Sequence, residues 1–215
     1  DRTGLISGRV TAMARDGFGN LWVGTREEGV SVFDSQGRHV TNLSSFDEQL
    51  YSDNVLALGG KGTRMVAVSA DRFTPQGSPA GGGFVVLDIA ANGSGGYTFT
   101  KESGVPSPLD VGSDVLVEDT AIWFSTSGQG LWVRDESVVP REFRQELTGA
   151  DGLLSNNVKR VLRAPHFPSG TEVLWLGTGA GLQNYDPGTG TLETIAAFTG
   201  RNILDLYVKG SMLWI

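Results

Sequence analysis

Short hydrophobic runs alternate with turn-forming residues along the whole chain. The runs are four to six residues long, and clusters of Gly, Asn, Asp and Ser separate them. No window of ten or more residues shows the 3.6-residue period of an amphipathic helix. The pattern therefore predicts an all-β protein whose short strands are joined by tight turns.

One hydrophobic run, which contains a tryptophan, recurs along the chain. Copies or partial copies of "NLWVGT" at 20–25 lie at 64–69, 121–126, 173–178 and 212–215. Their central residues are Trp22, Val66, Trp123, Trp175 and Trp214, separated by 44, 57, 52 and 39 residues. A repeat of this length, if each copy forms several strands, is typical of a stacked all-β architecture.

Each copy has the same surroundings. A short hydrophobic run precedes it, and a Gly followed by a second hydrophobic run and a more polar fourth run come after it. Four antiparallel strands in a unit of about 40–50 residues indicate the blade of a β-propeller. The expected repeats are 4–43, 50–100, 105–145, 151–195 and a half repeat, 201–215, about four and a half blades in all.

Local residue choices predict turn geometry within these units. "DGFGN" at 16–20 is expected to be a hairpin turn in which Gly19 and Asn20 take positive φ values. An Asp follows the third run of every full unit and is expected to cap the next turn through its side chain. These residues are Asp34, Asp88, Asp135 and Asp186. Gly24 and Gly177, inside repeated strands, are expected to mark close approach of neighbouring chain.

The repeats resemble a known family. "RDGFGNLWVGTREEGVSVFD" at 15–34, and "DGLLSNNVKRVL" at 151–162 with "EVLWLGTGAGLQNYDPGTG" at 172–190, are similar to two-component regulator propeller repeats. The third repeat matches through Trp123 and Gly130. The second lacks the Trp and carries an insertion, and the C-terminal half repeat matches only through "LWI".

The resemblance implies a function. In this family such repeats form seven-bladed propellers that serve as extracytoplasmic sensors of membrane-bound histidine kinases, often hybrid ones, and some members bind oligosaccharides. It implies a non-enzymatic sensor that is periplasmic or extracellular and recognises an oligosaccharide or another small ligand. The parent protein would be membrane-anchored, with any kinase module outside this chain. A protein-interaction scaffold and, third, a propeller lyase or lactonase remain alternatives.

The number of units departs from the family pattern. Four and a half units cannot close a seven-bladed ring, and the chain begins at Asp1 rather than Met. We therefore expect a processed or engineered fragment of a larger propeller. The remaining blades would come from the rest of the parent protein or from a second copy of the chain, because open blade faces promote association.

Charge and composition narrow the possible partners and chemistry. The 215 residues carry a net charge of −7 and no cluster of Lys and Arg, which argues against nucleic acid and anionic membranes as partners. There is no Cys, and the two histidines, His39 and His166, stand isolated in sequence. No catalytic residue, metal site or cofactor is therefore expected. Pairs of carboxylates from different blades remain an open alternative, because the sequence does not show which residues of different blades are neighbours.

The repeating tryptophans invite a functional interpretation, as platforms on which a sugar could stack. A residue that recurs in each blade is expected to have a role that recurs in each blade, whereas a ligand rarely contacts every blade in the same way. Packing between adjacent blades is therefore the preferred role of Trp22, Trp123, Trp175 and Trp214.

Segments that do not repeat are better candidates for ligand binding. The insertion "ADRFTPQGSPAGGG" at 70–83 lies between second and third strands, a connection that shares a face with the loops linking consecutive blades. Arg72 and Phe73 offer a charged donor and a stacking surface there. The linking loops contribute further candidates, Asp47, Glu48, Tyr51 and Asp110. The alternative is that the insertion is a disordered loop of Gly, Ser and Pro.

Overall fold

The computed structural model describes residues 4–73, 75, 79–102, 109, 111–167, 169–210 and 212–215, without the side chains of residues 79 and 80. The chain divides into two compact units. Unit 1 comprises residues 1–112 and 117–119, and unit 2 comprises residues 113–116 and 120–215. In the described parts of the chain, the regular structure is β-strand apart from two short 3₁₀-helices, Gly149–Asp151 and Ala196–Phe198.

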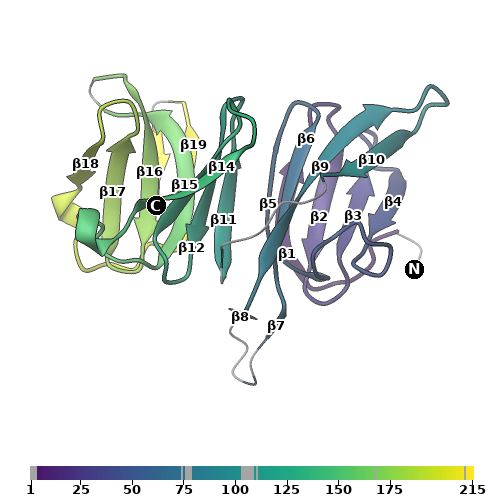
Figure 1. Ribbon diagram of the computed structural model, residues 1–215, viewed down its shortest axis with the longest axis horizontal. Helices are drawn as coiled ribbons and strands as arrows, with labels where there is room; N and C mark the ends of the chain where they lie inside the picture. Colours follow the sequence, from purple (N-terminus) through teal and green to yellow (C-terminus); the bar gives the residue numbers. More distant parts are fainter. Residues whose placement is uncertain are drawn as a thin grey trace. The chain divides into compact units, whose positions relative to one another are not determined.

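Unit 1 contains two antiparallel four-stranded sheets (Figure 1). The first has the order β1(Val10–Arg15), β2(Leu21–Thr25), β3(Val30–Phe33), β4(His39–Leu43). The second has the order β10(Tyr97–Lys101), β9(Gly83–Ala91), β6(Arg64–Ala70), β5(Asn54–Lys61). Between β6 and β9, β7(Arg72–Phe73) pairs with β8(Pro79–Ala80) in a small hairpin. The insertion thus lies between the second and third strands of its sheet.

Unit 2 repeats the same plan. One sheet has the order β11(Gly112–Val117), β12(Ala121–Thr126), β13(Leu131–Asp135), β14(Glu142–Leu147), with residues 113–116 of β11 in this unit. The other has the order β15(Val158–Pro165), β16(Glu172–Thr178), β17(Gly181–Asp186), β18(Thr191–Thr194). A two-stranded sheet, β19(Tyr207–Lys209) with β20(Met212–Trp214), follows.

Within each unit the sheets stack face to face through hydrophobic side chains. In unit 1, Trp22 of the first sheet lies in one core cluster with Leu58 and Leu87 of the second. In unit 2, Trp123 shares a cluster with Leu174 of the following sheet. Stacked four-stranded antiparallel sheets are the blades of a β-propeller, so the predicted fold class is confirmed.

Glycines in the second strands permit this stacking. A Cβ on Gly24 would lie 2.6 Å from Cγ1 of Val55 in the next blade. A Cβ on Gly177 would lie 2.8 Å from Cγ2 of Ile203. Since Cβ atoms do not approach other carbons so closely, both positions require glycine for the next segment to pack.

The first turn differs from its prediction in one respect. Gly19 has φ of +83°, as expected, but Asn20 does not have a positive φ, and that part of the prediction is wrong. Asp16, only 6% exposed, fixes the turn instead. Its Oδ1 accepts hydrogen bonds from the backbone N–H groups of Phe18 and Asn20, and its Oδ2 accepts from Asn20 Nδ2 and Trp22 Nε1.

The four repeated Asp residues do not behave alike. The carboxylates of Asp34, Asp135 and Asp186 accept hydrogen bonds from backbone N–H groups two residues later, as expected for turn caps. Asp88 is different because β9 continues to Ala91, so Asp88 lies inside the strand and pairs with Arg64. A turn cap at Asp88 is therefore a wrong prediction.

The four tryptophans also differ in environment. Trp22, Trp123 and Trp175 are 0%, 3% and 5% exposed, each in a core cluster. Trp214 is 55% exposed, although it occupies the same position in the repeated sequence motif.

Candidate functional site

Three connections meet at one end of unit 1. They are the β2–β3 turn at residues 26–29, the link between the two blades at 44–53, and residues 71–73 at the start of the insertion. Gly29 donates its N–H to the carbonyl of Asp53 (2.9 Å), and Asn54 Nδ2 donates to the carbonyl of Asp71 (3.1 Å). We call residues 26–29, 44–53 and 71–73 the loop face. The β7–β8 hairpin extends from this end of the unit (Figure 1).

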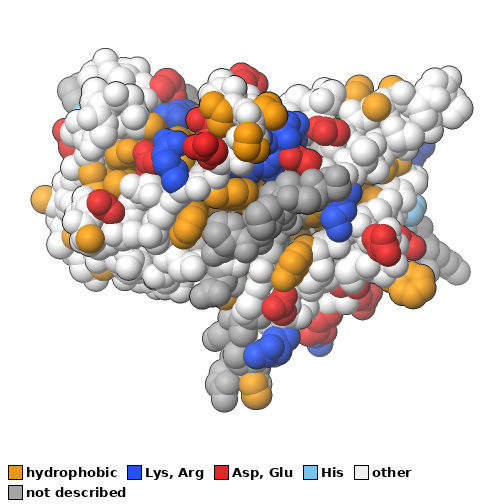
Figure 2. Space-filling model, in the orientation of Figure 1, with side chains coloured by type: hydrophobic (Ala, Val, Ile, Leu, Met, Phe, Trp, Pro, Cys, Tyr) orange, Lys and Arg blue, Asp and Glu red, His pale blue; other side chains and the backbone are white. Residues whose placement is uncertain are grey.

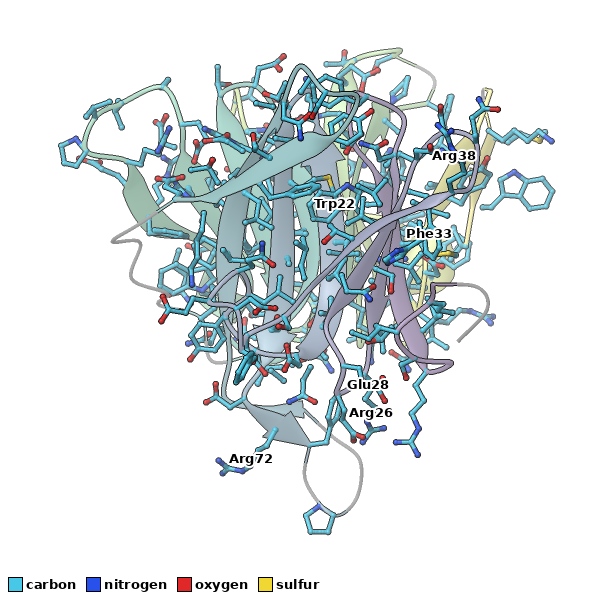
Figure 3. All side chains as sticks on the ribbon, turned by 90° about the vertical axis from the view of Figure 1, so that its right-hand side faces the viewer. Trp22, Arg26, Glu28, Phe33, Arg38 and Arg72 are labelled. Carbon is cyan, nitrogen blue, oxygen red and sulfur yellow. The ribbon has the colours of Figure 1, made fainter. Side chains whose placement is uncertain are left out.

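Arg26 and Phe73 join the β2–β3 turn to the insertion. The guanidinium carbon of Arg26 lies 3.7 Å from the centroid of the Phe73 ring, a cation–π contact. Glu27 Oε1 lies 3.5 Å from Arg26 Nε and balances its charge. Figure 3 shows Arg26 and Glu28 at the same end of unit 1 as the exposed Arg72. The insertion is thereby tied to the first blade.

Tyr51 joins the linking loop to the insertion. Its side chain hydrogen-bonds with that of Asp71, and its ring covers Gly83 at the start of β9. Partial burial, together with the Asp71 carboxylate, raises the pKa of the Tyr51 hydroxyl above its ordinary value of 10.0. Tyr51 is therefore a neutral hydroxyl at physiological pH, and it is 45% exposed.

The linking loop is held by its own polar side chains and by a lysine of β10. Asp47 Oδ2 accepts a hydrogen bond from Ser44 Oγ (2.9 Å). The Asp53 carboxylate accepts from the N–H and the hydroxyl of Ser45. Lys101 Nζ donates to the carbonyl of Glu48 (3.0 Å). Asp47 and Glu48 thus lie on an ordered turn with their side chains exposed.

Backbone strain is concentrated on this face. Among the described non-glycine residues, only Glu27 (φ +80°) and Glu48 (φ +60°) take positive φ values. This conformation crowds the Cβ of an L-residue and costs about 1–3 kcal/mol. Strain of this kind is frequent where loops bind ligands, because the surrounding structure holds the loop in a fixed shape.

The structure thus brings together most of the residues that the sequence suggests. Arg72, Phe73, Tyr51, Asp47 and Glu48 all belong to the loop face, whereas Asp110 lies outside the described residues. Sequence reasoning missed Arg26 and Asp71. The sequence did contain a signal for Arg26. The residue that follows the second strand is Arg26 in the first repeat but Ser127 in the third and Gly179 in the fourth, so Arg26 belongs to the residues that do not repeat.

The loop face is acidic and partly aromatic. It carries six carboxylates and two arginines, together with Phe46, Tyr51 and Phe73. Figure 2 shows acidic and basic side chains close together at this end of unit 1. Such a surface suits a neutral or cationic polar ligand that also offers an apolar face. Within the described ranges, no three His, Asp or Glu side chains converge to hold a metal ion, and no helix could span a membrane.

Comparison with known proteins supports the sequence resemblance. Residues 4–27 match the family model described as two component regulator propeller. No curated protein matches the chain. Solved structures are similar in fold, although all those compared below share 16% identity or less with this chain.

Three of these structures illustrate the similarity. The Cps50 (Swd1) β-propeller domain of Myceliophteria thermophila has a TM-score of 0.61 at 14% identity, covering 94% of this chain and 59% of that one. An extracellular domain from Bacteroides thetaiotaomicron, described as part of a putative hybrid two-component system, has a TM-score of 0.58 at 13% identity, and the match covers 90% of this chain and 26% of that one. An auxiliary nutrient binding protein from the same species has a TM-score of 0.52 at 14% identity, and the match covers 87% of this chain and 41% of that one.

The chain therefore spans 59% of the first of these structures and smaller shares of the others. At such low identity the similarity establishes the fold alone. The chain has a β-propeller fold, and its residues 4–27 match the two component regulator propeller model.

Proposed function

We propose that this chain is the ligand-recognition part of an extracytoplasmic sensor in a two-component signalling receptor. The match of residues 4–27 to the two-component regulator propeller repeat is the main support. Two proteins of similar fold are described as an extracellular domain of a hybrid two-component system and as a nutrient binding protein. The parent protein would be membrane-anchored, with catalysis, if any, outside this chain.

The loop face is the proposed recognition site. Phe73 and Tyr51 supply aromatic surface, and Arg72 supplies a charged hydrogen-bond donor. The carboxylates of Asp47 and Glu48 can accept hydrogen bonds from hydroxyl groups. This combination suits an oligosaccharide or a similar small polyhydroxylated ligand, whose rings stack on aromatic faces while its hydroxyls form hydrogen bonds. The bound form would then favour one arrangement of the receptor over another.

A second candidate function is a scaffold for a protein partner. Phe46, on the ordered linking loop, is 91% exposed. An exposed aromatic side chain on a fixed loop is suited to fill a pocket of another protein, since such residues contribute strongly to interface stability. Asp47 and Glu48 beside it would form the polar rim.

A thermal-shift screen separates the two functions. Wild-type chain is heated with a panel of oligosaccharides, and Phe46→Ser serves as the variant that lacks the exposed aromatic side chain of the scaffold proposal. The sensor proposal predicts that at least one oligosaccharide raises the melting temperature of both proteins. If no oligosaccharide does so, and wild type but not Phe46→Ser retains a partner from a membrane extract of the source, the scaffold function replaces it.

A further inference from the structure

Two hydrophobic strand faces are exposed although the equivalent faces of other blades are buried. One lies on β1 of the first blade, and the other lies on β19 and β20. We call them the β1 face and the β20 face. Within each unit, the first strand of a blade packs against the tryptophan of the blade before it. The two faces are therefore the two halves of one kind of contact.

The β1 face consists of Val10 and Met13, which are 44% and 66% exposed. Met13 points away from the core of unit 1, because its strand neighbours Ala12 and Ala14 pack against that core. A β-bulge between Val10 and Ala12 puts Val10 on the same side of the strand as Met13. The first strand thus presents two apolar side chains to solvent.

The counterparts of Met13 in other blades are buried. Met13 pairs with the residue that follows Trp22, and Leu58 and Val161 pair with the residues at the same place in their own repeats. Leu58 is 8% exposed and shares a core cluster with Trp22 of the preceding blade. Val161 is 5% exposed and shares a cluster with Trp123 of its preceding blade. A residue at this place in a first strand is thus suited to pack against a tryptophan.

Val10 leads to the same conclusion independently. Val55 and Val158 hold its place in β5 and β15, three residues before the counterparts of Met13. Both are 0% exposed and belong to the clusters that join their blade to the preceding one. The β1 face therefore has the composition of a surface that a preceding sheet covers.

The β20 face has the complementary composition. Trp214, Met212 and Tyr207 are 55%, 58% and 62% exposed. Val208 and Leu213, on the opposite side of the two strands, pack against the core of unit 2. Trp214 is the tryptophan of the repeated motif, and in the first and third blades that residue is covered by the first strand of the next blade. The β20 face thus offers a tryptophan without such a strand among the described residues.

We propose that the β20 face of one copy of the chain packs on the β1 face of a second copy. Trp214 would contact Met13 of the second copy as Trp22 contacts the equivalent Leu58 inside unit 1. A second copy fits because this chain itself carries both halves of the contact, at equivalent places in the repeat. The association is heterologous, so it forms a ring where the rotation closes and a filament where it does not.

The charged residues of the two faces are compatible with this contact. Asp205, just before β19, is already paired with Arg160 (2.6 Å) and needs no basic residue from the second copy. Ala12 stands in β1 where Arg160 stands in β15, because each pairs with the glycine of its repeated motif, so no charge is buried there. Arg15 and Lys209 are exposed, so their charged ends can remain in solvent.

The test is sedimentation velocity with two variants that each remove one half of the contact. Met13→Ser keeps the β20 face, and Trp214→Ser keeps the β1 face. We expect each variant alone to associate roughly tenfold more weakly than wild type, because an apolar side chain of the contact becomes a small polar one. An equimolar mixture of the two should form a 1:1 heterodimer, because Trp214 of one chain and Met13 of the other are both intact.

A control and three outcomes make the test decisive. Val139→Ser removes a side chain that is 95% exposed on another surface and should associate like wild type. If Trp214→Ser abolishes association and Met13→Ser does not, two β20 faces pair with each other and the proposed contact is wrong. A mixture that forms no heterodimer also overturns it. A wild-type chain that is monomeric at every concentration excludes a second copy and leaves the β20 face to a different partner.

Discussion

Asp16 and Trp22 show how one side chain can define a blade. The Asp16 carboxylate accepts four hydrogen bonds, and one of them fixes the indole N–H of the fully buried Trp22 at 2.9 Å. The Trp22 ring meets Phe99 of the second blade edge-on, with 5.4 Å between centroids. The turn and the contact between the two blades of unit 1 are therefore linked through a single carboxylate.

Replacing Asp16 should destabilise unit 1. In Asp16→Ala the amide of Asn20 and the indole N–H of Trp22 would lose their acceptor while remaining buried, at a cost of about 2–4 kcal/mol in the free energy of unfolding. Urea unfolding followed by tryptophan fluorescence measures the change. Glu142→Ala, an exposed substitution in unit 2, is the control. Equal midpoints for Asp16→Ala and Glu142→Ala would show that this network does not stabilise the fold.

Individual side-chain contacts of this kind could not be predicted from the sequence. The Trp-containing pattern predicted buried strands, because hydrophobic spacing reports burial. It did not predict that Asn20 would be bound by Asp16 rather than take a positive φ, since that depends on which acceptor lies nearby. Arg26 and Asp71 were missed for a similar reason. Arg26 contacts Phe73, 47 positions later in the sequence, and this contact depends on how the two blades pack.

At the level of elements, the turns after the third strands of three blades share one electrostatic feature, an ionised Asp that accepts hydrogen bonds within the turn. Hydrogen bonds to Asp34, Asp135 and Asp186 lower the pKa of each carboxyl from the ordinary value of 3.8. The largest contributions come from the N–H of Arg38, the hydroxyl of Ser137 and the N–H of Gly188, respectively. The folded state thus favours the ionised form of all three carboxylates.

This device predicts the direction of the pH dependence. A carboxyl with a lowered pKa stabilises the folded state fully above about pH 3.8, and the contribution is lost as the pH falls through the lower folded value. The melting temperature should therefore fall on acidification below about pH 4. The variant Asp34→Asn/Asp135→Asn/Asp186→Asn, which keeps the side-chain caps but cannot titrate, should show a flatter curve. Parallel curves for the two proteins between pH 7 and pH 2.5 would refute this explanation.

The repeated elements were predictable and their exceptions were not. Four-stranded blades could be predicted because each unit carries the same order of hydrophobic runs and turns. Asp88 failed as a turn cap because β9 is longer than the other third strands, and strand length depends on pairing with β10 rather than on local sequence. Most of the loop face could be predicted only indirectly, because its segments differ from one repeat to the next.

At the scale of the molecule, hydrophobic side chains gather on the last strand pair. Tyr207, Met212 and Trp214 are 62%, 58% and 55% exposed on β19 and β20. The other tryptophans in this position are buried by neighbouring segments. An exposed apolar surface of this kind favours association with a further blade or with a second copy of the chain.

Sedimentation velocity tests this expectation. Wild-type chain should associate as its concentration rises, and Met212→Ser/Trp214→Ser should associate less, because the apolar contact area is reduced. Val139→Ser removes a hydrophobic side chain that is even more exposed, at 95%, from another surface and is the control. A single monomeric species at all concentrations of the wild-type chain would contradict the expectation.

The most direct test of the account is calorimetric titration of the loop face with the oligosaccharide that raises the melting temperature most. We predict that Phe73→Leu and Arg72→Ala each weaken its binding by about 5–30-fold, equivalent to about 1–2 kcal/mol, and that Arg72→Ala melts like wild type. Arg201→Ala, an exposed arginine of unit 2, should bind as wild type does. Unchanged affinity in both loop-face variants would contradict the assignment of ligand recognition to this surface.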